Sequence, residues 1–203
     1  MLALRRSSVA AGFFGAVLAA GATAFAGVTG SIHDFSARGW TGGESCKVCH
    51  VPHHAEQTLA DAPLWNHTTT VAAFTLYRSS TLHKTVGEPG TRSKACLSCH
   101  DGTVALNSFG GAVGGEFAAG RALVGPDLSD DHPVGIAFYH APGLVCSNCH
   151  GGRPMRLVST LPFFDGKVEC ASCHDVHNQR VGGARLVRTT LAGSALCLHC
   201  HPK

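Results

Sequence analysis

The stretch Cys96-Leu97-Ser98-Cys99-His100 decides how this chain is organised. Its pattern is two cysteines separated by two residues and followed at once by a histidine, and it occurs five times. In chain order the copies, here called motifs 1 to 5, are Cys46-Lys47-Val48-Cys49-His50, Cys96-Leu97-Ser98-Cys99-His100, Cys146-Ser147-Asn148-Cys149-His150, Cys170-Ala171-Ser172-Cys173-His174 and Cys197-Leu198-His199-Cys200-His201. These motifs contain all ten cysteines of the 203-residue chain.

The Cys-x-x-Cys-His pattern is the attachment signature of c-type haem. Two thiols at this spacing can add to the two vinyl groups on one edge of a porphyrin, and the next residue then lies against the iron as its proximal ligand. The sequence therefore predicts five covalently attached haems c. The cysteines of the five motifs are the predicted attachment points, and the predicted proximal iron ligands are His50, His100, His150, His174 and His201.

Two other uses of paired cysteines fit the pattern less well. A disulfide framework is common in exported chains, but it does not require a histidine after every second cysteine. Structural zinc sites combine two Cys-x-x-Cys units, and five units cannot be divided into pairs. Thioether bonds to haem would instead use every thiol and leave no disulfide.

Residues 1–26 have the features of a secretory signal peptide. Arg5 and Arg6 form a positive start, an apolar stretch follows over residues 9–25, and Ala24-Phe25-Ala26 is a small-x-small cleavage site. We expect cleavage after Ala26, export to the periplasm or the cell exterior, and no retained membrane anchor. A retained anchor is the weaker alternative, because glycines interrupt a stretch that is short for spanning a bilayer.

The composition of the remaining chain indicates that its interior is filled by something other than side chains. The sequence has 25 glycines and nine prolines, and only 7% of its residues are aromatic. Five haems would supply the missing apolar interior. We therefore expect one domain over residues 27–203, with few short α-helices and mostly irregular loops wrapped around a haem core, and little or no sheet. The formal net charge of +3 indicates no nucleic-acid surface.

Histidines outside the motifs are the predicted distal ligands. Apart from Met155 no methionine follows the signal segment, so histidine must fill the sixth position of nearly every iron. Nine histidines are available: His33, His53, His54, His67, His83, His132, His140, His177 and His199. The favoured five are His33, His53, His67, His132 and His177. An iron with two imidazole ligands is coordinatively full, so it carries electrons and does not bind substrate.

The positions of three of these histidines carry more information. His53 and His177 each lie three residues after a motif histidine, on the same side of that motif's own porphyrin. They cannot reach its opposite face, so each can ligate only a neighbouring haem. His132 precedes a proline, which favours extended backbone, and Asp131 is the expected acceptor for its ring.

Several segments resemble the small multihaem c-type cytochromes of metal-respiring bacteria, some of which polymerise into extracellular filaments. They are CHVPH at residues 49–53, APLWNH at 62–67, FTLY at 74–77, CLSCHDGTVA at 96–105, DHPVG at 131–135, CASCHDVHN at 170–178 and SALC at 194–197. The resemblance implies bis-His haems and implies that His53 can ligate a haem of the adjoining subunit. The four-haem members have no attachment site where motif 3 lies, and His83 and His140 are the local candidates for its distal ligand.

These features predict a function in electron transfer. The favoured role is extracellular electron transfer, with the chain as the subunit of a filament. The alternative is a soluble periplasmic shuttle that delivers electrons to a reductase. A multihaem reductase is less favoured, because it needs an open sixth position, whereas every motif here ends in histidine and spare histidines are plentiful. A structural or metal-storage protein is the least favoured alternative. The expected partners are other redox proteins or further copies of this chain.

Overall fold

The structure is a computed structural model that describes residues 27–59, 61–82, 84–138, 160–178 and 185–201. The predicted signal peptide, motif 3, His83 and His140 lie outside the described residues. Four of the five motifs, and all five favoured distal histidines, lie within them.

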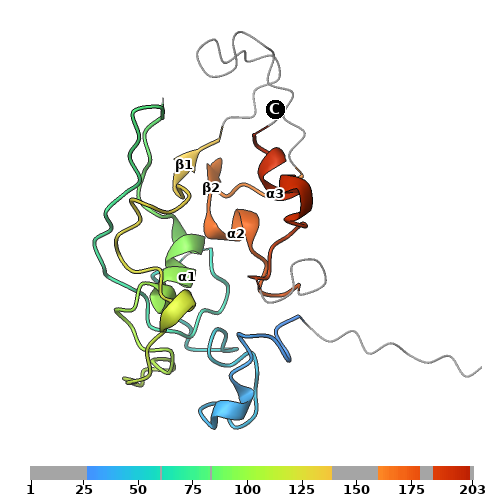
Figure 1. The fold of residues 1–203 in the computed structure, drawn as a ribbon. Helices are drawn as coiled ribbons and strands as arrows, with labels where there is room; N and C mark the ends of the chain where they lie inside the picture. The colour runs from blue at the N-terminus through green and yellow to red at the C-terminus, as the bar shows by residue number, and fades with distance from the viewer. Residues whose placement is uncertain (1–26, 60, 83, 139–159, 179–184, 202–203) are drawn as a thin grey trace, which may run out of the picture.

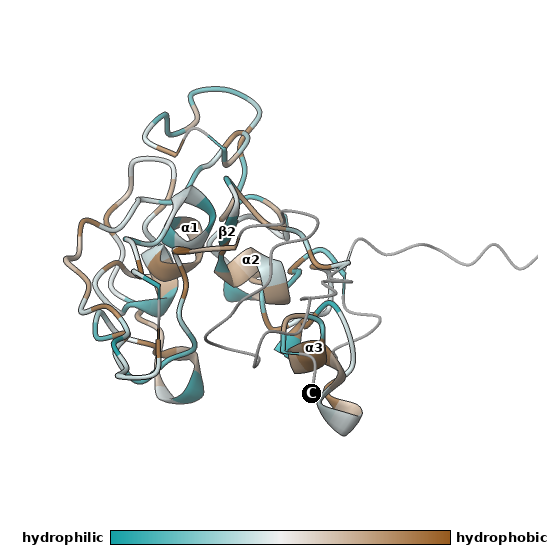
Figure 2. Cartoon of the chain, turned by 90° about the horizontal axis from the view of Figure 1, so that it is seen from above, coloured by the Kyte–Doolittle hydropathy of each residue, from teal (hydrophilic) through white to brown (hydrophobic). Residues whose placement is uncertain are grey.

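Helices are few and short. The longest is α1 (Thr91–His100), and α2 (Cys170–Cys173) and α3 (Ala195–Leu198) each cover four residues. The 3₁₀ turns are η1 (Ser36–Arg38), η2 (Gly120–Ala122) and η4 (Ala192–Ser194). The three α-helices lie in a row with α2 in the middle, in both the front view and the view from above (Figures 1 and 2).

The sheet consists of two short antiparallel strands. β1 (Ile136–Ala137) pairs with β2 (Lys167–Val168), so that Ile136 lies opposite Val168 and Ala137 opposite Lys167. β2 ends one residue before Glu169, the N-cap of α2, and this pairing therefore fixes where α2 begins. The expectation of few short helices, irregular loops and little sheet is confirmed.

α1 packs against α2, and Glu169 joins their starting points. Its carboxylate accepts the backbone N–H of Gly90 at 3.1 and 3.2 Å and also accepts a hydrogen bond from the Ser93 hydroxyl. Ser93 Oγ in turn accepts the Cys170 backbone N–H at 2.9 Å. Because the first amides of a helix lack partners within it, these contacts stabilise both helix starts at once.

The buried hydrophobic side chains of the described residues are few, and most of them are leucine or valine. Among the described residues they are Val48, Leu59, Trp65, Leu97, Ala105, Leu128, Leu161, Val168, Leu186 and Val187. Several large apolar side chains are exposed instead, among them Val71 at 98% and Val113 at 97%. Hydrophobic segments are spread over loops and helices alike (Figure 2). This protein core is thin for its chain length, as expected if a cofactor completes it; the haem core itself stays a prediction.

Candidate haem sites

The four described motifs share one local geometry. In motifs 1, 4 and 5 the backbone N–H of the histidine donates to the carbonyl of the first cysteine, at 2.8 Å in His50, 3.0 Å in His174 and 2.9 Å in His201. Motif 2 forms the last turn and a half of α1. Residues three and four apart on a helical turn lie on the same face, so both sulfurs and the imidazole of a motif project to one side.

Hydrogen bonds orient the motif histidines in a common way. Nδ1 faces a backbone carbonyl oxygen in three of them, at 2.9 Å from Pro63 for His50, 2.6 Å from Ala122 for His100 and 2.8 Å from Arg185 for His174. A neutral ring that donates its Nδ1–H to a carbonyl leaves the lone pair of Nε2 free for a metal. These three rings are thus held in the tautomer that an iron ligand requires.

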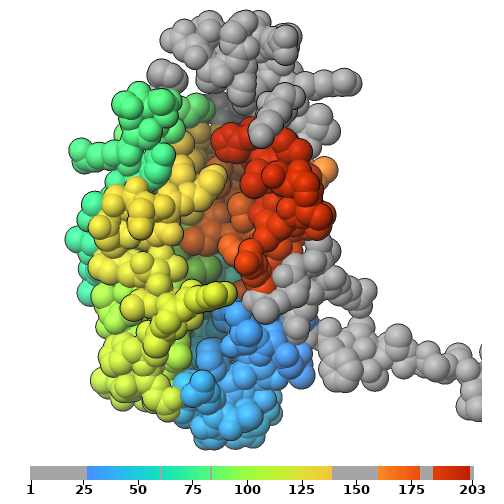
Figure 3. Space-filling model, in the orientation of Figure 1, coloured from blue at the N-terminus to red at the C-terminus, as the bar shows by residue number. Residues whose placement is uncertain are grey.

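Histidines outside the motifs lie next to motif histidines in three places. The ring centres are 5.9 Å apart for His33 and His100, 6.2 Å for His50 and His177, and 6.4 Å for His132 and His201. In Figure 3 the segment around residue 132 (yellow) and the C-terminal segment (red) flank a hollow in the surface. The structure therefore brings together three predicted distal ligands with three predicted proximal ligands.

His33 provides a direct check on whether these residues fit a haem. Its Nδ1 is buried and has no hydrogen-bond partner among the described residues. Burial, and then the nearby rings of His100 and His174, lower the pKa of His33 to about 4, so the ring is neutral at physiological pH. A neutral imidazole is the form that binds a metal. Together with the paired cysteines, this donor set fits a c-type haem.

His67 and His53 are placed differently. His67 is 1% exposed; its Nδ1 lies 2.8 Å from the Thr68 carbonyl oxygen and its Nε2 lies 3.0 Å from that of Ala105. Burial lowers the pKa of His67, and a neutral ring can donate only one of these bonds, so one nitrogen keeps a free lone pair. His53 is exposed, and its Nδ1 lies 2.9 Å from Nδ1 of His54. Ligation by His67 or His53 stays a prediction.

The ring of His132 has a different partner from the expected one. Its Nδ1 lies 3.2 Å from the carbonyl oxygen of Pro133, the next residue. The prediction that Asp131 accepts from this ring is therefore wrong, because the carbonyl of Pro133 is the group that faces it. A backbone acceptor can fix the tautomer equally well.

The thiols of different motifs lie close enough to influence one another. Burial and the neighbouring Cys46 raise the pKa of Cys49 to about 11, and burial, Cys49 and Asp101 raise the pKa of Cys99 to about 12. A hydrogen bond with Cys170, followed by burial, raises the pKa of Cys96. Motif 1 therefore lies beside motif 2, and motif 2 beside motif 4.

The same effect places motif 5 beside motif 4. Burial raises the pKa of Cys173, and the Cys200, Cys170 and Cys197 thiols raise it further. The row of helices in Figure 1 follows the same sequence, from α1 through α2 to α3. Motifs 1 and 2, 2 and 4, and 4 and 5 are thus neighbours, and the contact of His50 with His177 also brings the segment after motif 4 next to motif 1. The eight described cysteines form no disulfide.

Two aspartates that directly follow motif histidines anchor the sites. Asp101 is 3% exposed and accepts hydrogen bonds from the Thr70 hydroxyl and from the backbone and side chain of Thr103. Asp175 accepts a hydrogen bond from Arg188 at 3.0 Å. The sequence analysis missed both roles, although the shared Cys-His-Asp of motifs 2 and 4 was a signal for them.

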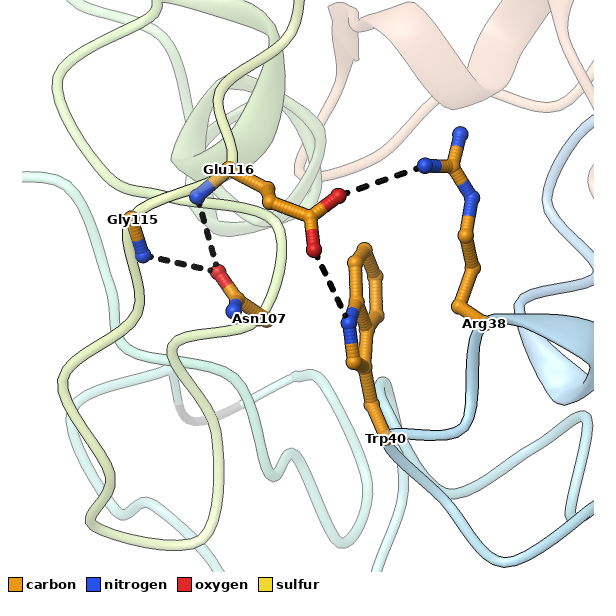
Figure 4. Close-up of polar contacts among 5 residues, drawn as sticks. All are labelled: Arg38, Trp40, Asn107, Gly115 and Glu116. Carbon is orange, nitrogen blue, oxygen red and sulfur yellow. Dashed lines mark hydrogen bonds and ion pairs between the residues drawn. The ribbon is translucent and has the colours of Figure 1, made fainter.

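The N-terminal segment is attached to the loop after motif 2 through Glu116 (Figure 4). Its carboxylate accepts hydrogen bonds from Arg38 at 3.2 Å and from the Trp40 indole at 3.1 Å, while Asn107 Oδ1 accepts the Glu116 backbone N–H at 3.0 Å. Trp40 also stacks on Phe35, with ring centres 5.5 Å apart. These contacts hold the segment that carries His33.

One comparison with known proteins gives a match. Residues 162–203, which contain motifs 4 and 5, match the family described as doubled CXXCH motif. This match indicates a multihaem c-type cytochrome, a class that carries covalently bound haem, usually transfers electrons and is typically exported. No curated protein matches the chain. In the ranges that the structure describes, no helix is long and apolar enough to cross a membrane.

Proposed function

We propose that this chain is an electron-transfer protein that carries five bis-His haems c and acts in extracellular electron transfer as a filament subunit. The observation that supports it best is that motifs 1, 2, 4 and 5 lie next to one another. Four neighbouring attachment sites would give electrons a path through the described part of the chain. A bound bis-His haem c supplies one-electron redox chemistry at an iron whose coordination positions are filled.

The chain's own residues would attach, orient and enclose the cofactors. The paired cysteines fix each porphyrin edge, and the backbone carbonyls that face the motif histidines hold those rings in one tautomer. The ring of His33 lies beside that of His100, and its buried Nδ1 has no partner among the described residues, which supports ligation by a second imidazole and no open position at that iron. This argues for a carrier and against a reductase.

Motif 1 and motif 5 are suited to contact with other molecules, because each has an exposed cysteine. Cys46 of motif 1 and Cys197 of motif 5 are exposed, whereas the described cysteines of the inner motifs 2 and 4 are partly buried. Exposed terminal sites suit electron exchange with a partner, either another redox protein or a second copy of this chain. His53, exposed and close to motif 1, is the candidate ligand for a haem of the adjoining subunit.

Haem content is the first test of the proposal. The exported, purified protein should contain five haems per chain by pyridine haemochrome assay, and a thiol reagent should label none of its ten cysteines after denaturation. The oxidised protein should show only low-spin ferric haem by electron paramagnetic resonance. A high-spin signal, or a spectral change on adding nitrite, would instead support the reductase reading.

Negative-stain microscopy separates the filament from the soluble shuttle. Filaments are expected from the wild-type protein and from His54→Asn, and only isolated particles from His53→Asn. The neighbouring exposed His54 makes this a matched control, and asparagine suits the positive φ of 60° at that position. Isolated particles from the wild type at every concentration would overturn the filament role and favour the shuttle.

A further inference from the structure

We propose that three histidine pairs are the opposite axial ligands of three irons: His33 with His100, His50 with His177, and His132 with His201. The inference rests on the proposed function, because it requires motifs 1, 2 and 5 to carry haem. It goes further by assigning a partner to each proximal ligand.

The ring separations carry the assignment. Two imidazoles that bind one iron from opposite faces, each through a metal–nitrogen bond of about 2 Å, have ring centres roughly 6 Å apart. The three observed separations are 5.9, 6.2 and 6.4 Å. The ring planes differ by 56°, 27° and 73°, which is compatible with ligation because each ring can rotate about its own iron–nitrogen bond.

The composition of the pairs supports the same assignment. Each pair contains one motif histidine and one histidine from a distant part of the chain. In two pairs the motif ring, His50 or His100, already uses Nδ1 toward a carbonyl oxygen and so presents Nε2. In the third pair the non-motif ring, His132, is the one with Nδ1 at a carbonyl.

In two of the three non-motif rings, those of His33 and His177, Nδ1 has no hydrogen-bond partner among the described residues. Nδ1 of His33 is buried without a partner, an arrangement that costs free energy unless a further group completes the site. Nδ1 of His177 lies 3.8 Å from the Asp175 carboxylate, too far for a hydrogen bond. His177 therefore has a ring that faces His50 and no strong competing contact in the described residues.

Trp65 shows why distance alone does not decide the pairing. Its ring centre also lies 6.2 Å from that of His50, but the indole nitrogen carries a hydrogen and cannot donate a lone pair to iron. The imidazole of His177 can. For His50, chemistry and distance together therefore select His177.

The pair of His50 with His177 joins the fourth motif to the first. His177 follows His174 by three residues, so the short segment 170–177 would hold the proximal ligand of one iron and the distal ligand of another. This explains in structural terms why a histidine that cannot reach the far face of its own porphyrin is present at that position.

The test exchanges ligands in chains that lack one chosen haem. His177→Met is made in the full five-haem protein, in a Cys46→Ala/Cys49→Ala background that lacks haem 1, and in a Cys197→Ala/Cys200→Ala background that lacks haem 5. His132→Met is made in the same three chains, and His54→Met is the control. An altered haem is detected as the near-infrared charge-transfer band of methionine-ligated ferric haem or as a high-spin signal.

The two variants should give crossed results. His177→Met should alter one haem in the full protein and in the chain without haem 5, and none in the chain without haem 1. His132→Met should do the reverse, and His54→Met should alter none. An altered haem that persists when the assigned haem is absent, or no altered haem in the full protein, would overturn the pairing.

The number of haems per chain distinguishes a failure of the histidine pairing from a failure of the proposed function. A wild-type protein without covalent haem overturns both, whereas five haems with uncrossed results overturn the pairing alone. If a haem-deficient chain does not accumulate, a high-resolution structure of the haem-loaded wild type answers the same question. The pairing is wrong if the rings of His50 and His177 do not flank one iron.

Discussion

The carboxylate of Glu169 accepts the backbone N–H of Gly90, and so one buried acid caps the helix of motif 2 while it begins the helix of motif 4. Glu169 is 2% exposed, and both of its oxygens face donors. The two residues are far apart in the sequence. Their contact sets the spacing between the second and fourth attachment sites, and with it the distance an electron would have to cross.

Replacing Glu169 by alanine should destabilise the protein markedly. The change leaves the Gly90 N–H and the Ser93 hydroxyl without their acceptor, and losing a charged, buried acceptor costs about 1.5–3 kcal/mol. Thermal unfolding of the haem-loaded protein measures the loss. Glu44→Ala, at an exposed carboxylate, is the control and should leave the melting temperature nearly unchanged. Equal stability of the two variants would contradict the capping role.

Gly90→Ala should disturb the same contact from the other side. A β-carbon at position 90 would lie 2.6 Å from Oε1 of Glu169, so the carboxylate must move away from its donors. Such overpacking costs about 1–3 kcal/mol. Gly115→Ala is the matched control, since a β-carbon there meets nothing within 4 Å. The double variant Gly90→Ala/Glu169→Ala should be less destabilised than the sum of the single changes.

Asp101→Ala should loosen the loop that carries His67. The change removes the acceptor of Thr70 and Thr103 beside the second motif, at an expected cost of about 2 kcal/mol. Thr70→Val removes one of the hydrogen bonds to Asp101, together with the contacts of the Thr70 hydroxyl with the Ala72 backbone N–H and the Thr103 hydroxyl, and should cost about 1 kcal/mol. Thr68→Val, at an exposed hydroxyl nearby, should have little effect. Chemical denaturation of the three variants gives the ranking, and a reversed order of Asp101 and Thr70 would rule out this arrangement.

The ion pair of Arg38 with Glu116 should contribute little to stability. Its side chains are 56% and 50% exposed, and exposed pairs are worth about 0.2–1 kcal/mol. A double-mutant cycle with Arg38→Met and Glu116→Gln measures the coupling directly. The coupling should shrink further in high salt. A coupling above this range would mean that the pair is shielded from solvent in the haem-loaded protein.

Asp127 should titrate below the usual range of a carboxyl group. The hydroxyl and then the backbone N–H of Ser129 donate to its carboxylate and lower its pKa. The contribution to stability is present at pH values above the ordinary carboxyl pKa and is lost as the pH falls through the lowered value. A titration followed by nuclear magnetic resonance should show a higher pKa of Asp127 in Ser129→Ala and an unchanged pKa of Asp127 in Ser80→Ala.

The attachment motifs allowed much of the fold to be predicted. Short helices at motifs 2, 4 and 5 and the scarcity of sheet are in keeping with a chain that has few aromatic residues and many glycines. The sequence could not indicate that Glu169 accepts the backbone N–H of Gly90, the N-cap residue of α1. Such a contact depends on how distant segments pack, and a single glutamate carries no local pattern that distinguishes it from a solvent-exposed one.

The sequence predicts which histidines belong to the candidate haem sites, but it does not predict which two of them lie next to each other. The histidine that follows each pair of cysteines is identifiable by spacing alone, and the position of His177 already excluded its own motif. The spacing does not say which other ring it meets. That choice depends on how distant segments pack, which here brings the segment after motif 4 next to motif 1.

The closeness of the His50 and His177 rings has a consequence for biogenesis. A chain delivered from its N-terminus presents motif 1 to the attachment machinery long before residue 177 arrives, and contacts between distant residues form late in folding. The earliest porphyrin to be attached would thus be among the last to be enclosed.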